Sequence, residues 1–135
     1  MHVVKVPAED IFQALSERIR IRIIRLLADC RSEACLCDLA ESLDEPDYKL
    51  SRHLKVLRQT GLLDAEKDGR WIYHSLNRGT ASLVDLYKFV QTLPDTDKQF
   101  AIDRKKFEAR KKSSSGARCK TETKNVRSVL KRVRS

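Results

Sequence analysis

The feature that most constrains the fold is an Asp68-Gly69 dipeptide between two strand-like runs. Residues 62–67 and 70–76 flank it, and the second run contains Trp, Ile and Tyr, which favour strands. Glycine accepts the positive φ angles that a two-residue hairpin turn requires, so Asp-Gly at this place is a strong hairpin signal. A hairpin enclosed by helical segments on both sides leaves few folds open.

Apolar residues before this hairpin repeat at helical spacing. One stretch runs from Glu9 to about Ala28 and divides near Ser16, whose hydroxyl could cap the second of two helices. That second helix also carries four arginines, which we expect to form a solvated face over packed aliphatic stems: Arg18, Arg20, Arg22 and Arg25.

A short helix at about 35–42 and a longer helix at about 47–60 are expected next. Pro46 separates them, because a proline disfavours helical geometry in the residue before it and is tolerated in the first turn of a new helix. Gly61 then supplies a C-terminal stop. The longer helix has an apolar face at i, i+4, i+7 spacing, formed by Leu50, Leu54 and Leu57.

A last core helix is expected from about Thr80 to Leu93, where Pro94 ends it. Two helices, a short helix, a turn, a helix, a hairpin and a helix make up the order of a winged helix-turn-helix. We therefore predict a mainly α fold with a β-hairpin wing. In such a module the helix at 47–60 enters the major groove of DNA, and the helix at 35–42 supports it.

The outer side of the helix at 47–60 is rich in hydrogen-bond donors. Arg and Lys can pair with guanine edges, and Ser can bond bases or phosphates. Basic residues at the hairpin tip would meet phosphates or the minor groove. For His53, which lies beside the leucines, a half-buried position is the alternative to a base contact. The predicted DNA contacts are Tyr48, Lys49, Ser51, Arg52, His53, Lys55, Lys67 and Arg70.

One such domain contacts only a few base pairs, so these modules generally dimerise on a two-fold operator. The first and last core helices carry more apolar surface than a small core requires. We expect them to form a homodimer interface, with packing inside a single protomer as the alternative. The residues expected at this interface are Ile11, Phe12, Leu15, Leu83, Leu86, Tyr87 and Val90.

The net charge of +9 is concentrated toward the C-terminal end. Residues 101–135 hold 13 Lys and Arg against 3 Asp and Glu, whereas residues 1–100 hold 15 against 16. A basic tail binds any polyanion, so it carries no sequence-specific signal for DNA. We expect a DNA-binding and dimerisation domain at 1–94, an extra helix that could form within 95–112, and a basic, disordered tail at 113–135.

The composition also bounds the class of protein. No apolar run approaches the roughly 20 residues needed to cross a bilayer, and the N-terminus lacks the residue order of a signal peptide. We expect a cytoplasmic protein with no membrane partner. The sequence shows no phosphate loop, acid–base pair or nucleophile constellation, so we do not expect an enzyme.

The cysteines are the residues best suited to bind a ligand, and in a reducing cytosol they would act as thiols: Cys30, Cys35, Cys37 and Cys119. A cysteine near a helix N-terminus tends to have a lowered pKa, which favours the metal-binding thiolate. Successive residues of a regular helix turn by about 100°, so Cys35 and Cys37 would point to nearly opposite sides of a helix at 35–42. We therefore expect a shared guest to distort the first turn of that helix, and with it the support of the DNA-contacting helix.

Several segments carry a resemblance to a known family. They are Glu-Ala-Cys-Leu-Cys-Asp-Leu at 33–39, Leu-Ser-Arg-His-Leu at 50–54, Leu-Arg at 57–58, Gly-Leu-Leu at 61–63 and Gly-Arg-Trp at 69–71. Together they resemble the ArsR/SmtB family of winged-helix metalloregulatory repressors over about residues 9–93. The Cys-x-Cys at the start of the supporting helix is most similar to the arsenic-responsive branch.

This resemblance implies a transcriptional repressor that binds double-stranded operator DNA as a dimer and dissociates when As(III) or Sb(III) binds Cys35 and Cys37. The metalloid would be an inducer, with no constitutive cofactor. Many arsenic-sensing relatives carry a third cysteine where this chain has Ala40. Cys30 is therefore the first candidate for a third ligand, and Cys119 or a water or hydroxide is the alternative.

The same residues bear on other functions. A thiol-redox-responsive repressor of this fold would use the cysteines in sulfur-state chemistry. A metal-storage protein is disfavoured because the cysteines are few. The zinc site of the family's last helix needs histidines and carboxylates, but the helix at 80–93 offers only Asp85. Zinc is therefore disfavoured as the inducer.

Overall fold

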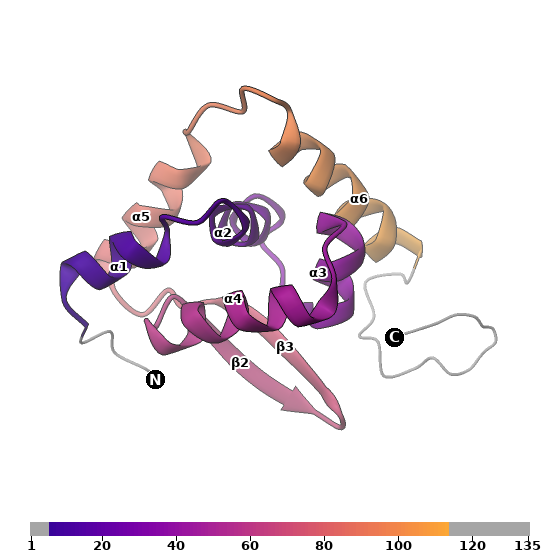
Figure 1. Cartoon of the computed structure of the whole chain (residues 1–135), viewed down its shortest axis with the longest axis horizontal. Helices are drawn as coiled ribbons and strands as arrows, with labels where there is room; N and C mark the ends of the chain where they lie inside the picture. Colours follow the sequence, from indigo (N-terminus) through magenta and orange to yellow (C-terminus); the bar gives the residue numbers. More distant parts are fainter. Residues whose placement is uncertain (1–5, 114–135) are drawn as a thin grey trace.

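The computed structural model of the chain describes residues 6–113. Within them, helices enclose the core and a small antiparallel sheet extends from it (Figure 1). The predicted mainly α architecture with a β-hairpin is present. The elements are α1 (Ala8–Ala14), α2 (Arg18–Cys30), β1 (Ala34–Cys35), α3 (Leu36–Leu43), α4 (Asp47–Gln59), β2 (Leu63–Asp68), β3 (Trp71–Leu76), α5 (Ala81–Gln91) and α6 (Gln99–Ser113).

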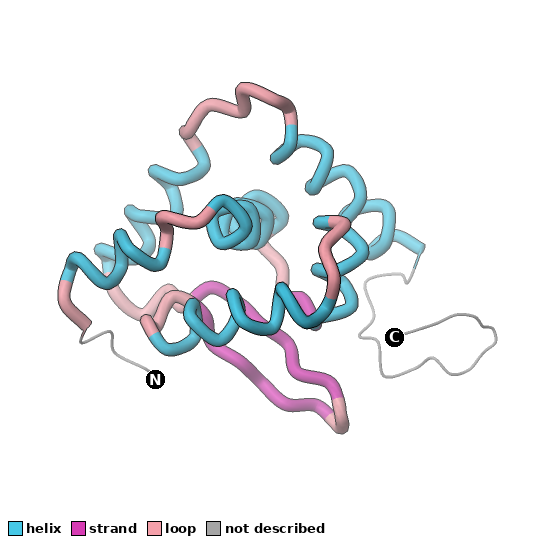
Figure 2. Tube along the Cα trace, in the orientation of Figure 1, coloured by secondary structure: helices cyan, strands magenta, loops and turns pink. Residues whose placement is uncertain are grey.

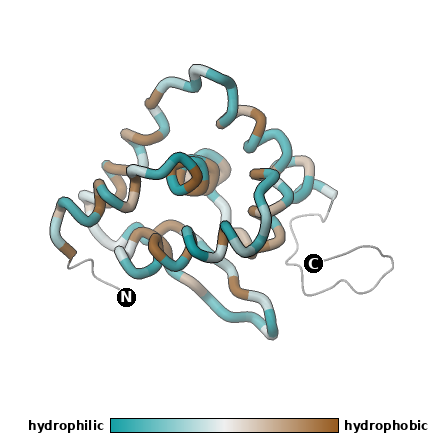
Figure 3. The backbone as a smooth tube through the Cα atoms, in the orientation of Figure 1, coloured by the Kyte–Doolittle hydropathy of each residue, from teal (hydrophilic) through white to brown (hydrophobic). Residues whose placement is uncertain are grey.

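Helix α2 is the centre of the fold. Figure 1 looks nearly along its axis, and α4, α5 and α6 pack against it. Its apolar residues lie at the middle of the molecule (Figure 3) and include the fully buried Ile23 and Leu27. Ser16 does not cap this helix, because its hydroxyl donates instead to the Gln13 carbonyl, and Glu17 takes the N-cap position.

Helices α3 and α4 form the predicted pair around a short turn. Asp44 ends α3 in the left-handed region, with φ of 56°, and Pro46 stands at the N-cap of α4. The predicted leucine face of α4 is buried as expected. Gly61 follows α4 with φ of 79°, a conformation that glycine adopts without steric cost. The sequence placed both helices to within about one residue.

The hairpin predicted from Asp68-Gly69 joins β2 and β3, with Gly69 at φ of 66°. The strands pair antiparallel from Leu63 opposite Leu76 to Asp68 opposite Trp71. The two-residue strand β1, which the sequence analysis did not predict, pairs with β3 and gives the sheet order β1-β3-β2 (Figure 2). This pairing joins the start of α3 directly to the middle of β3.

The C-terminal helix α6 packs on α2 and α3, and its Phe107 is buried in the common core. The expectation of an extra helix within 95–112 thus has a counterpart in Gln99–Ser113. The domain division at residue 94 stays a prediction. The Ser-rich and basic segment beyond Ser113 lies outside the described residues.

A buried ion pair fastens α6 to α2. Arg22, only 6% exposed, donates to both carboxylate oxygens of Asp103 at 2.9 and 2.8 Å. The same guanidinium donates to the Leu43 carbonyl at 2.7 Å and to Glu45 at 3.3 Å, at the end of α3 and in the turn after it. The expectation that all four arginines of α2 are solvated is therefore wrong for Arg22, because its partners lie at remote sequence positions.

Replacing Asp103 with Ala should lower the free energy of unfolding by about 3–5 kcal/mol, because it leaves the buried Arg22 charge without its main partner. Glu41→Ala is the control, since that carboxylate is 65% exposed in its ion pair with Arg110 and its loss should cost under about 1 kcal/mol. Urea unfolding of the three chains measures both effects. Equal losses for the two variants would contradict a structural role for the Arg22–Asp103 pair.

Candidate functional site

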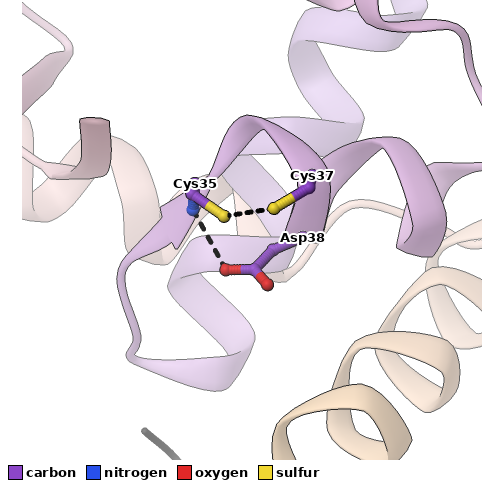
Figure 4. Close-up of side chains that lie close together, drawn as sticks. All are labelled: Cys35, Cys37 and Asp38. Carbon is purple, nitrogen blue, oxygen red and sulfur yellow. Dashed lines mark hydrogen bonds between the residues drawn. The ribbon is translucent and has the colours of Figure 1, made fainter. Parts of the chain in front are cut away.

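Cys35 and Cys37 face one another at the start of α3 (Figure 4). Their sulfur atoms are 2.8 Å apart and are not joined in a disulfide. The expectation that the two side chains diverge is wrong. Cys35 is the last residue of β1 and the N-cap of α3, with an extended backbone at φ of −88° and ψ of 173°, so the 100° helical rotation does not apply to it.

A carboxylate completes the cluster. The Asp38 Oδ2 atom accepts the Cys35 backbone N–H at 3.0 Å, and the Cys35 side chain accepts the backbone N–H of Asp38 in return. This reciprocal arrangement is a capping box in which cysteine replaces the usual Ser or Thr. One ligand atom from each of Cys35, Cys37 and Asp38 lies within 4.8 Å of the others. Within residues 6–113 this is the one such group of three or more.

Two cations from α6 hold the Asp38 carboxylate. Arg110 donates from Nε to Oδ1 at 2.6 Å, and the Lys111 ammonium donates to Oδ2 at 3.1 Å. Asp38 is 2% exposed, so these ion pairs are largely shielded from water. The pKa of Arg110 is raised well above its usual range, since hydrogen bonding and charge from Asp38, with Cys37 and Glu41 adding to them, outweigh its desolvation.

Asp38, Arg110 and Lys111 were not among the predicted site residues. A signal for Asp38 existed, because an acidic residue three positions after an N-cap is the signature of a capping box. Arg110 and Lys111 lie about 70 positions further along the chain. Their contact with Asp38 depends on the packing of α6 on α3, which has no local sequence signature.

Cys30, at the end of α2, is not part of the cluster formed by Cys35, Cys37 and Asp38. It lines a separate hollow with Phe107, Glu108 and Lys111. Burial and the neighbouring carboxylates raise the pKa of its thiol to about 11, which disfavours the thiolate. Its predicted role as third ligand therefore has no geometric support, and Cys119 lies outside the described residues.

A cleft of about 370 Å³ connects the cysteines to the predicted DNA-contacting elements. Cys35 and Cys37 form one wall, and α4 contributes Ser51. Arg70 and Trp71 of the hairpin form another part of the lining, with the Arg70 guanidinium 5.2 Å from the centre of the Trp71 ring. A guest bound to the thiols would thus lie in a cleft that is also lined by the helix and the hairpin predicted to contact DNA.

The exposed face of α4 contains most of the predicted DNA contacts. Tyr48 is 75% exposed, and Ser51, Arg52 and Lys55 are also exposed on this helix. Lys49 is half-buried and paired with Glu45 at 3.2 Å. On the hairpin, Lys67 and Arg70 are exposed. The roles of these residues in binding DNA stay predictions.

His53 does not share that exposed face. Its side chain is 8% exposed, and its Nδ1 accepts from the Arg20 guanidinium at 3.3 Å. Burial and the nearby positive charge lower its pKa. The burial argues against the predicted base contact and favours the half-buried alternative, because residue 53 falls on the same side of α4 as the buried Leu50, Leu54 and Leu57.

The residues predicted for a dimer interface divide into two groups. Leu83, Tyr87 and Val90 are buried inside the protomer, where the Tyr87 hydroxyl donates to the Leu62 and Asn77 carbonyls. The remaining members are partly buried, apart from Phe12, which is 67% exposed. Phe89 on α5, which was not predicted, is 60% exposed. The face of α5 toward α2 therefore serves the protomer core, and dimerisation stays a prediction.

The chain is similar to known bacterial regulators. A family model described as "Bacterial regulatory protein, arsR family" matches residues 17–65. The arsenic resistance transcriptional regulator ArsR2 of Pseudomonas putida is 34% identical over 94 residues, which are 70% of this chain and 79% of that protein. The arsenical resistance operon repressor of Escherichia coli is 40% identical over 68 residues, which are 50% of this chain and 57% of that protein.

Solved structures show the same fold. Reduced HlyU from Vibrio cholerae N16961 superposes with a TM-score of 0.55 at 23% identity, over 62% of this chain and 83% of that chain. The winged helix-turn-helix prediction is thereby confirmed. The family model and the curated relatives, taken with this fold, define the class of protein as a transcription regulator. The chain belongs to the arsR family of bacterial regulatory proteins. The curated relatives are named as regulators or repressors, which supports the expectation that the chain is not an enzyme.

Across residues 6–113, the structure contains no helix with the length and apolar character required to span a bilayer.

His74 on β3 lines the same cleft, and its protonation depends on pH. Its ring is 3% exposed and its Nε2 accepts from the Arg58 guanidinium at 3.0 Å. Burial, with Arg58 adding to it, lowers the pKa of His74 from 6.5 to about 4. Between these two values the unfolded chain binds a proton that the folded chain does not, so stability is lost as the pH falls.

We expect this histidine to reduce the free energy of unfolding by about 2 kcal/mol between pH 7 and pH 5. Urea unfolding of the native chain and of His74→Gln at both pH values measures the effect as a difference between their pH dependences, so that other titrating groups cancel. The variant should lose less stability on acidification than the native chain. Parallel pH dependences would show that His74 is not held neutral by its surroundings.

Proposed function

We propose that the protein is a transcriptional repressor that binds operator DNA as a homodimer and releases it when As(III) or Sb(III) binds Cys35 and Cys37. The observation that carries the proposal is the convergence of two thiols at the N-cap of α3, in a cleft shared with α4 and the hairpin. The names of the relatives from Pseudomonas putida and Escherichia coli support arsenic as the signal.

The donor set suits a thiol-seeking metalloid. Two sulfur atoms are already close together, and soft thiolates select soft acceptors over hard cations. Each bond to arsenous acid forms as a thiol sulfur displaces one hydroxide, which leaves with the thiol proton as water. Two such steps give a dithiolate complex that keeps one hydroxide as its third ligand, with no change of oxidation state. Cys30 and Cys119 are then not required.

Binding would act on the start of α3, although for a different reason from the one first expected. A guest bonded to both sulfurs ties Cys35 to Cys37 and fixes the orientation of both side chains. Cys35 is at once the cap of α3 and the end of β1, so a displacement of Cys35 would disturb the support of α4 and the pairing of β1 with β3 together.

The exposed faces of α4 and the hairpin are the proposed DNA-contacting surface. Arg52 on α4 is exposed, so it could reach base edges or phosphates in the major groove, whereas α6 packs on α2 and α3 (Figure 1). Homodimerisation is proposed through α1 and α5, because Phe12 and Phe89 are large apolar side chains that the protomer leaves exposed.

Loss of the proposed switch is expected in Cys35→Ser and Cys37→Ser. A binding duplex is first selected from a random-sequence DNA library, and fluorescence anisotropy then follows its complex during arsenite titration under reducing conditions. The native chain should lose affinity by about tenfold or more, in the usual range of coupling between two sites. The serine variants should hold DNA throughout, and Cys30→Ser should respond like the native chain. Undisturbed DNA binding by the native chain at saturating arsenite would end the proposal.

Arg52→Ala should weaken binding to the selected duplex by about 1–3 kcal/mol, because a side chain that bonds a base edge or a phosphate is removed. Lys105→Ala is the matched control, since it removes one exposed positive charge from α6. Anisotropy at fixed salt compares the two. Equal weakening would mean that net charge, rather than the α4 surface, determines binding.

A thiol-redox repressor is the second candidate, and the 2.8 Å sulfur contact favours it specifically. Hydrogen peroxide could oxidise the two thiols to a disulfide, because the two thiol protons combine with the reduced peroxide and leave as two waters. The same anisotropy assay separates the candidates. Release by peroxide without release by arsenite under reducing conditions would support the redox function instead.

A further inference from the structure

Two cations of α6 contact Asp38, the carboxylate of the Cys35–Cys37–Asp38 cluster. Arg110 and Lys111 each donate to a different oxygen of Asp38, and the Cys35 backbone N–H donates to Oδ2 as well. The side chain of Asp38 is 3% exposed, that of Arg110 is 21% exposed and that of Lys111 is 18% exposed. These contacts belong to α6, a helix outside the segment that the family model matches.

Without those cations the cluster would suit a divalent metal ion. Two thiolates and one carboxylate, with their ligand atoms within 4.8 Å of one another, provide three protein ligands for Zn²⁺ or Cd²⁺, and a water can complete a tetrahedron. With the cations in place, a metal ion that takes Asp38 must displace both ion pairs. It would then sit beside two positive charges that have lost their partner in a shielded site, which opposes binding.

We propose that Arg110 and Lys111 are specificity-determining residues that exclude divalent cations from the Cys35–Cys37 site and leave it selective for uncharged arsenous or antimonous acid. This inference deepens the proposed function and rests on it. Arsenous or antimonous acid carries no charge, so the two cations do not repel it. The acid also brings its own oxygen ligand, so it needs only the two sulfurs and leaves Asp38 in its ion pairs.

The ligand count leads to the same result as the charge. With Asp38 held by α6, a divalent ion finds two protein ligands where stable protein sites for zinc provide three or four. Trivalent arsenic is complete with two thiolates and one hydroxide. The absence of a third cysteine at Ala40 is therefore tolerable for the metalloid, and the α6 cations keep Asp38 from supplying a third ligand to a competing metal.

The test is the affinity of the reduced full-length chain for Cd²⁺, measured without DNA by competition with a chromophoric chelator and by the thiolate-to-cadmium charge-transfer absorbance. The double variant Arg110→Gln/Lys111→Gln should bind Cd²⁺ at least about tenfold more tightly than the native chain. Its arsenite affinity should change by less than about threefold. Adding Asp38→Asn to the double variant should abolish the gain, because the third ligand is removed.

Lys105→Gln/Lys106→Gln is the matched control, because it removes the same charge from exposed positions of α6. It should leave the Cd²⁺ affinity unchanged. The single variant Lys111→Gln keeps the Arg110–Asp38 pair and should give a smaller gain, which preserves the test if the double variant loosens α6, as circular dichroism would reveal.

Three results would overturn the inference: a native chain that binds Cd²⁺ as tightly as the double variant, an equal gain in the Lys105/Lys106 control, or a gain that persists in Asp38→Asn. These outcomes are independent of the proposed function. A native chain that fails to bind arsenite would refute that function, even where the cadmium affinities follow the pattern expected here.

Discussion

The Asp38 carboxylate is the constraint on which the arrangement of this molecule depends. It caps α3 through the Cys35 N–H and at the same time anchors α6 through Arg110 and Lys111. A buried carboxylate is costly unless it is paired and hydrogen-bonded, and here three donors from two segments bond to it. The position of Cys35, and hence the distance between the two sulfurs, follows from this arrangement because Cys35 shares in the capping box.

A second buried charge acts at the other end of α3. Arg22 reaches from α2 to Asp103 on α6 and to the Leu43 carbonyl where α3 ends. Helix α6 is thus fixed near both ends of the supporting helix, by the Asp38 pairs at its start and by the Arg22 network at its close. Such hydrogen-bonded ion pairs stabilise one arrangement specifically, since breaking either partner leaves an uncompensated charge. The orientation of α4 therefore depends on a helix that contributes no residue to the proposed DNA-contacting surface.

The sequence was sufficient for those parts of the fold that depend on local periodicity and turn chemistry. The leucine face of α4, the stop at Gly61 and the hairpin at Gly69 were predicted because each is determined by residues within a few positions. The cysteine geometry was missed by a single position: at the N-cap, rather than in the first turn, Cys35 has an extended backbone, and the sulfurs converge. Strand β1 and the contacts of Arg22 and Arg110 could not be predicted, because their partners lie roughly 40 to 80 positions away.

The location of the thiols removes the need for long-range transmission in the proposed switch. Cys35 is hydrogen-bonded into the same sheet as the hairpin, opposite Tyr73, and the cleft that contains both thiols is also lined by Ser51 of α4 and Arg70 of the hairpin. A guest on the sulfurs would therefore bias both proposed DNA-contacting elements through direct neighbours, whereas coupling over longer paths requires separate evidence for each link. The two-residue strand β1 is the shared element: it carries Cys35 and pairs with β3, and β3 is a strand of the hairpin.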